Sequence, residues 1–234
     1  MMLPDLREKV LTANLDLVKY KLVTLTWGNA SGINREKGLV VIKPSGLSYD
    51  GMQLSDMVIV DLEGNVIEGT HNPSSDTPTH LKLYKALKNI GGIAHTHSKY
   101  ATMFAQAGVE IPCLGTTHAD SFNGVIPVTR FISKEEVEKG YEENTATVII
   151  ERLSGINPLE IPAVLVRGHG PFTFGKTPGE AAENNHILET IAEMAFGTLN
   201  INPECENLPE CILNKHYNRK HGPDAYYGQK NKEK

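Results

Sequence analysis

The segment His95-Thr96-His97 places two histidines at a spacing that suits a metal ion. An apolar run precedes it, which predicts that the pair lies at the end of a β-strand, where residues i and i+2 point to the same face. Both imidazoles could then reach one ion. Pairs at this spacing are also common as hydrogen-bonded surface histidines, so the pair alone leaves both interpretations open.

Two further residues strengthen the metal interpretation. His169 follows another apolar run in Arg167-Gly168-His169-Gly170, and Asp76 stands before a helical pattern in the segment PSSDTP. Three neutral imidazoles with one carboxylate suit Zn²⁺, with Mn²⁺ or Co²⁺ as substitutes. An aspartate before Thr-Pro is also an ordinary helix N-cap, which would be the simpler explanation of Asp76 if the histidines were absent.

A second group of segments suits an anion. WGNASG (27–32) and KPSG (43–46) are turns rich in glycine and hydroxyl groups, and Ser74-Ser75 precedes a predicted helix N-terminus. Free N–H groups and the helix dipole favour phosphate at such a place. Each turn by itself is commonly just a turn. Together with a nearby metal, they predict a phosphate-binding site beside a Lewis acid.

Strands and helices that would position these residues alternate along the chain. Apolar residues recur every three or four positions from Leu3 to Leu17, which predicts an amphipathic first helix. Runs rich in Val and Ile predict strands, one pair joined by a turn at Glu63-Gly64-Asn65. The predicted strands are 39–46, 56–69, 92–97, 162–170 and 172–175, and the predicted helices are 77–90, 98–108, one that opens with a capping box at 133–136, and 177–199. The hairpin argues against a purely parallel sheet, so we expect a layered α/β fold with antiparallel pairing.

Composition and charge narrow the class of protein. With 234 residues and 40% apolar content, the chain is long enough for one well-buried core, and we expect a single domain. The net charge is −5 and the basic residues are scattered apart from the last segment, which indicates neither nucleic-acid nor membrane binding. No signal peptide and no apolar stretch of roughly 20 residues stands out. The cysteines Cys113, Cys205 and Cys211 show no paired spacing, so we expect a reducing, cytoplasmic location.

The motifs together resemble the class II aldolase family, and within it the L-ribulose-5-phosphate 4-epimerases. The resemblance covers nearly the whole chain. It rests on LVTLTWGNAS, VIKPSG, PSSDTPTH, GGIAHTHSKYAT, GTTHAD, GHGPF and KHYNRKHGPDAYYGQ, in that order and at compatible intervals. It implies one three-layer α/β/α domain with a largely antiparallel sheet, in which the tail 206–234 completes the active site. It also implies a homotetramer with active sites between subunits.

The resemblance assigns roles to individual positions. Asp76, His95, His97 and His169 correspond to the metal ligands, zinc being the expected ion. Asp120 and Tyr227 match the acid/base pair, with Tyr227 serving the metal of a neighbouring subunit. The positions that match phosphate and substrate contacts are Gly28, Asn29, Lys43, Ser45, Gly46, Ser74 and Ser75, and those in the tail that help to close the site are His216 and Arg219.

The resemblance implies an epimerase that interconverts L-ribulose 5-phosphate and D-xylulose 5-phosphate. C4 lies β to the carbonyl, so its C–H is not acidified, and a retro-aldol cleavage of C3–C4 followed by re-formation is expected. Related fuculose-phosphate aldolases have a catalytic glutamate where this chain has Asp76, and the shorter side chain favours ligation over proton abstraction. The alternatives are an aldolase that releases its products, a non-catalytic adducin-like binding protein, and a purely structural zinc site, which the distance of all cysteines from the histidines in sequence argues against.

Overall fold

Seven strands form one sheet in the order β4-β3-β2-β1-β5-β7-β6 in the computed structural model, which describes residues 1–228. All six neighbouring pairs are antiparallel. The strands are β1 (Asn29–Asn34), β2 (Leu39–Ile42), β3 (Val58–Asp61), β4 (Val66–Glu68), β5 (Gly92–His95), β6 (Ala163–Val166) and β7 (Gly170–Gly175). The antiparallel sheet expected from the hairpin signal and from the family resemblance is therefore confirmed.

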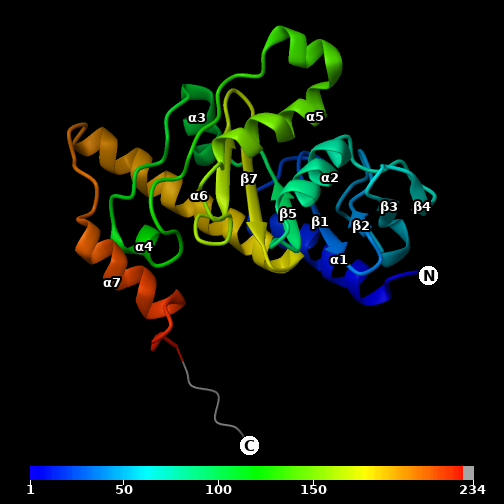
Figure 1. Cartoon of the computed structure of the whole chain (residues 1–234), viewed down its shortest axis with the longest axis horizontal. Helices are drawn as coiled ribbons and strands as arrows, with labels where there is room; N and C mark the ends of the chain where they lie inside the picture. The colour runs from blue at the N-terminus through cyan, green and yellow to red at the C-terminus, as the bar shows by residue number, and fades with distance from the viewer. Residues whose placement is uncertain (229–234) are drawn as a thin grey trace, which may run out of the picture.

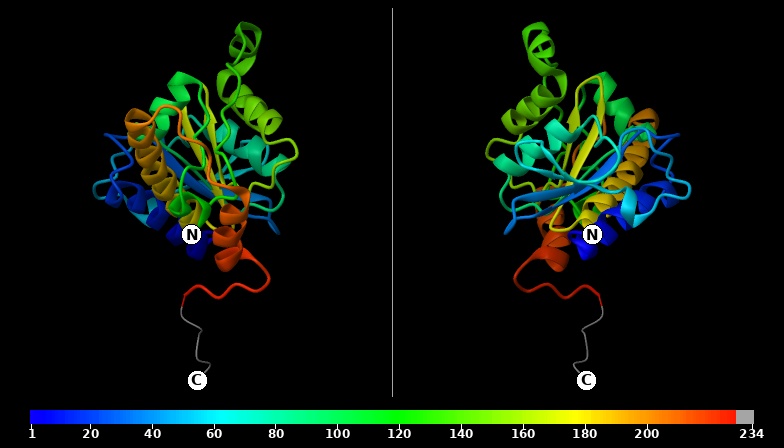
Figure 2. Two further views of the ribbon diagram at one scale, coloured as in Figure 1. Left: turned by 90° about the vertical axis from the view of Figure 1, so that its left-hand side faces the viewer. Right: turned by 90° about the vertical axis from the view of Figure 1, so that its right-hand side faces the viewer.

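Helices cover both faces of the sheet and make the fold three-layered (Figures 1 and 2). On one face lie α1, α3 and α6, and on the other lie α2 and α5. The helices are α1 (Pro4–Lys19), the 3-10 helix η1 (Leu54–Asp56), α2 (Thr77–Ala86), α3 (Lys99–Ala107), α4 (Thr116–Ala119), α5 (Lys134–Arg152), α6 (Pro178–Ile201) and α7 (Glu210–His221). Within residues 1–228, no helix combines the length and apolar character needed to cross a bilayer.

The core divides between the two faces because successive side chains of a strand point in opposite directions. In β2, Val40 packs in the cluster that includes Leu83 and Ile149 of α2 and α5, whereas Val41 packs with Val10 of α1. Strands β2 and β6 are buried on both faces, so they appear in the sequence as continuous apolar runs.

The composition of segment 27–32 predicted a turn, but the structure differs. From Asn29 onward the chain forms β1, which pairs with both β2 and β5. Polar and small residues are weak strand formers, but pairing on both edges satisfies their backbone groups. Gly32 is needed there because a Cβ atom would lie 2.6 Å from Pro178 Cγ and 2.9 Å from Leu6 Cδ1. The close packing of α1 and α6 against this strand decides its conformation. The local sequence pattern carries no information about that packing.

The other elements occur near their predicted positions, with differences at some ends. The capping box of α5 is confirmed, since Ser133 and Glu136 each bond to the other's backbone N–H. Helix α2 ends at Ala86, earlier than the Gly91-Gly92 signal predicted, and the polar tail contains the helix α7, which was not predicted. The last residues assigned to that tail, 229–234, lie outside the described part of the chain.

Candidate active site

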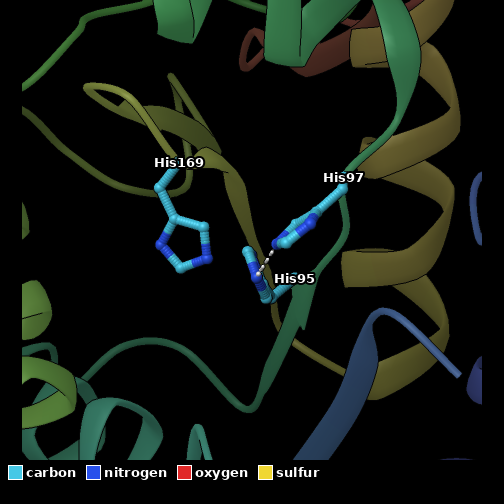
Figure 3. A group of neighbouring side chains, drawn as sticks. All are labelled: His95, His97 and His169. Carbon is cyan, nitrogen blue, oxygen red and sulfur yellow. Dashed lines mark hydrogen bonds between the residues drawn. The ribbon is translucent and has the colours of Figure 1, made fainter.

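The three histidines converge where β5 ends and β7 begins (Figure 3). His95 is the last residue of β5, and His169 directly precedes β7, which pairs with β5. One ring nitrogen from each of His95, His97 and His169 lies within 4.8 Å of the others, and the Nε2 atoms of His95 and His97 are 3.2 Å apart. Gly170 permits this approach, because a Cβ atom there would lie 2.7 Å from the carbonyl oxygen of Thr96.

The residue between the paired histidines fixes their direction. Thr96 is buried, and its hydroxyl donates a hydrogen bond of 2.8 Å to Asn185 Oδ1 in α6. Adjacent residues of an extended chain point to opposite faces, so anchoring Thr96 on the α6 side turns His95 and His97 to the other side. The i, i+2 spacing thus acts as the sequence predicted.

Hydrogen bonding and burial prepare the imidazoles for ligation. His95 Nδ1 donates to the carbonyl oxygen of Pro171 over 2.9 Å, which leaves the lone pair of Nε2 facing the other histidines. The ring of His95 also stacks on Phe172 at a centroid distance of 4.2 Å. Burial lowers the pKa of His97 and lowers the pKa of His169 to about 3. Both side chains are therefore neutral at neutral pH, as a ligand must be.

Asp76 lies beside this cluster, with Oδ2 at 4.0 Å from His95 Nε2. It occupies the N-cap position of α2, yet its side chain makes no capping bond. Instead Oδ2 accepts a bond of 2.6 Å from Asn29 Nδ2. Burial works against the ionised carboxyl, but the neighbouring His95 and His80 and the Asn29 amide outweigh it and hold the pKa of Asp76 below its usual value.

This donor set fits a divalent ion. Neutral imidazoles with one ionised carboxylate are borderline ligands of the kind that zinc takes, and the His95 hydrogen bond orients one of them in advance. The three histidines could hold the ion directly, and Asp76 lies beside them rather than within the group of closest ligand atoms.

The histidines form one wall of a cleft of about 410 Å³. Asp76 lies on the same side, and the other walls come from the start of β1 and from two loops, 43–46 and 74–75. All seven residues assigned by resemblance to phosphate and substrate lie along it: Gly28, Asn29, Lys43, Ser45, Gly46, Ser74 and Ser75. The structure therefore brings the expected ligand and anion positions to one cavity.

Lys43 is the cation of this cleft, but its side chain is only 1% exposed. Its Nζ donates to the carbonyl oxygens of Leu47 at 2.8 Å and Pro44 at 3.2 Å. Burial lowers the pKa of Lys43 to about 8. The ammonium thus holds the 43–47 loop in place and contributes positive charge beneath it.

Tyr141 and Glu142 of α5 also line the cleft, and no residue of this helix was predicted to reach it. Other site residues were predicted from histidine spacing or from glycine-rich turns after apolar runs. Neither signal is present at Tyr141 and Glu142. The one local signal is Gly140 within an otherwise helical segment, which marks a break in α5.

Asp120 and the predicted tail residues form a separate cluster (Figure 1, α4 and α7). Asp120 accepts bonds from Arg219 at 2.6 and 2.9 Å and from His216 Nδ1 at 3.0 Å. Partial burial opposes ionisation, but the bonds from Arg219 and His216 outweigh it and lower the pKa of Asp120. Tyr227 is 61% exposed and stacks over Arg219 at 5.1 Å. None of these four residues lines the histidine cleft of its own chain.

Two buried histidines outside the predicted ligand set make stability depend on pH. Burial lowers the pKa of both His80 and His118 from 6.5 to about 4. Because the folded pKa lies below the unfolded one, their contribution is fully present above pH 6.5 and is lost as pH falls toward 4. We expect the Tm in calorimetry to drop by at least about 5 °C over that interval.

His118→Gln tests the assignment, since glutamine does not titrate. The pH dependence of its Tm is expected to be shallower than that of the unchanged protein, whatever its Tm at neutral pH. Equal slopes for the two proteins would show that His118 is not a source of the acid sensitivity.

Comparisons with known proteins agree with this geometry. Residues 8–196 match the family described as "Class II Aldolase and Adducin N-terminal domain". An L-fuculose 1-phosphate aldolase is 26% identical with a TM-score of 0.79, over 92% of this chain and 95% of its own. YgbL of Klebsiella pneumoniae, assigned provisionally as an aldolase/epimerase/decarboxylase, is 26% identical with a TM-score of 0.71, over 90% and 97%. The L-fuculose-1-phosphate aldolase of Thermus thermophilus shares the fold at 23% identity and a TM-score of 0.66, over 87% and 100%. The chain belongs to the class II aldolase and adducin N-terminal domain family.

Proposed function

We propose that the protein is a metal-dependent L-ribulose-5-phosphate 4-epimerase, which forms D-xylulose 5-phosphate. The observation that carries the proposal is the cleft itself. It joins three histidines and Asp76 on one wall to hydroxyl- and glycine-rich loops on the other. Such a cavity suits a ligand with a phosphate at one end and vicinal oxygens at the other.

The chemistry of the substrate requires a carbon–carbon cleavage. A base removes the proton of the C4 hydroxyl, the C3–C4 bond breaks, and its electron pair stays with C1–C3 as an enediolate. C4 and C5 leave as glycolaldehyde phosphate, which rotates about its held phosphate. C3 then attacks the other face of the aldehyde, and the new C4 alkoxide takes a proton. Atoms and electrons balance without any redox partner.

The roles of the chain's residues follow from these steps. His95, His97, His169 and Asp76 would hold a divalent ion, zinc by their chemistry, with Mn²⁺ or Co²⁺ as substitutes. That ion supplies a Lewis acid for the negative charge that develops on the substrate oxygens. The loops at 43–46 and 74–75 would hold the phosphate, so that the aldehyde stays bound while it turns.

Asp120 and Tyr227 would exchange the C4 hydroxyl proton, one on each face. They lie outside the cleft of their own chain, so they would reach the cleft of a neighbouring subunit in a homotetramer. The packing of Tyr227 over Arg219, which is itself bonded to Asp120, supports their joint action, with His216 and Arg219 closing the site.

A second candidate is an aldolase that releases both fragments. It is favoured by the similarity to an L-fuculose 1-phosphate aldolase at 26% identity over 92% of this chain. Asp76 argues for the epimerase, because a side chain that is bonded to Asn29 and directed at His95 is placed to ligate an ion. A longer carboxylate at this position would extend further into the cleft and reach a substrate proton.

One assay separates the candidates. The zinc-loaded protein and a chelated control are incubated with L-ribulose 5-phosphate, and D-xylulose 5-phosphate and free glycolaldehyde phosphate are both followed. Metal-dependent xylulose 5-phosphate with little aldehyde is the expected result. Accumulating aldehyde would indicate the aldolase. No turnover of this or of other sugar phosphates would favour a non-catalytic binding protein.

A further inference from the structure

Tyr141 enters the cleft because α5 is interrupted directly before it. Gly140 has φ 145° and ψ 101°, which lies outside the helical region. Glycine adopts such a conformation more readily than any other residue. The chain resumes its helix at Tyr141, whose side chain reaches the histidine wall of the cleft. The break thus redirects one aromatic side chain toward the candidate ligands.

The backbone around this break is held by side chains. Thr145 Oγ1 donates to the carbonyl oxygen of Tyr141 at 2.9 Å, and Asn144 Nδ2 donates to that of Gly140 at 3.0 Å. Thr79 Oγ1 of α2 donates to the carbonyl oxygen of Glu142 at 2.6 Å. Helix α2 begins next to Asp76, so the last bond couples the position of Tyr141 to the same wall of the cleft.

The phenol oxygen of Tyr141 lies 3.3 Å from His169 Nδ1. Figure 3 shows the other ring nitrogen of His169 on the side of His95 and His97. A histidine that ligates through Nε2 carries its proton on Nδ1, and that proton then needs an acceptor. For His95 the acceptor is the carbonyl oxygen of Pro171. For His169, which is less buried than His95, the oxygen in reach is that of Tyr141.

We propose that Tyr141 is a positioning residue that orients His169: its oxygen accepts the Nδ1–H bond and presents the Nε2 lone pair to a divalent ion. The proposal rests on the metal site put forward under the proposed function. Tyr141 acts through His169 and needs no contact with the reacting atoms.

Tyr141→Phe tests the proposal by removing only the oxygen. Zinc affinity is measured on the full chain, stripped and titrated in competition with a chromophoric chelator. The dissociation constant is expected to rise by about 10- to 100-fold, as for other residues that orient a metal ligand. The matched control is Tyr20→Phe, because Tyr20 stacks on His186 in another part of the molecule. The zinc affinity of this control variant is expected to stay unchanged.

Gly140→Ala keeps the phenol but strains the break, so it is expected to weaken zinc binding as well. Its control is Gly197→Ala in α6, where an added Cβ meets no atom within 4 Å. If the unchanged protein takes up no zinc, the metal site itself is wrong and the proposed function fails. If it binds zinc and Tyr141→Phe binds equally well, the role of Tyr141 is wrong and the metal site stands.

Discussion

Replacing His95 with glutamine is expected to abolish stoichiometric zinc binding and to reduce turnover by on the order of a thousandfold or more. His95 is 2% exposed, and its Nε2 faces both His97 and Asp76. Glutamine fills a similar volume but offers no imidazole nitrogen. Zinc per chain is measured by elemental analysis after dialysis, alongside the rate of formation of D-xylulose 5-phosphate.

His71→Gln is the matched control for this variant. His71 is an exposed histidine whose ring lies 3.3 Å from Asp56, outside the cleft. Its zinc content and rate are expected to equal those of the unchanged protein. Full activity in a zinc-free His95→Gln variant would overturn the metal-dependent mechanism.

Asp120→Asn is expected to lower the rate of epimerisation by about 10²–10⁴-fold, the usual contribution of a general acid or base. Zinc content is expected to stay normal, because Asp120 is not one of the proposed metal ligands. The amide cannot take up or return the C4 hydroxyl proton, and it also weakens the bonds to Arg219 and His216. Rate and zinc content are therefore measured on the same preparation.

Asp120→Asn thus has two effects, the loss of proton transfer and the weakening of the bonds to Arg219 and His216. Tyr227→Phe separates them, because it removes the other acid/base group and leaves the Asp120 bonds in place. Both variants are expected to lose rate, whereas only Asp120→Asn is expected to make the chain near α7 more sensitive to protease. Asp50→Asn, at an exposed aspartate, serves as a surface control. An Asp120→Asn protein with normal zinc content, an intact fold and full epimerase activity would remove Asp120 from the mechanism.

The sequence was sufficient where local chemistry decides the outcome. The capping box at Ser133 and the turn at Glu63-Gly64-Asn65 act within a few residues, so the α5 start and the β3–β4 hairpin were predicted. The spacing of His95 and His97 carries its own geometry, since extended chain turns alternate residues to one face. The two imidazoles were therefore expected on one face, although the pair alone did not decide for a metal site.

Tertiary structure decided what depends on distant partners. Asn29–Asn34 is a strand only because β2 and β5 pair with it on both edges and Gly32 admits two helices. His169 meets His95 through the pairing of β5 with β7, across a long stretch of chain that no periodicity describes. Tyr141 enters the cleft through a break in α5 that Thr79 of another helix helps to hold. Residue types and their spacing thus determined which groups could do the chemistry, while strand register and helix packing decided which of them meet, because those contacts join segments far apart in the chain.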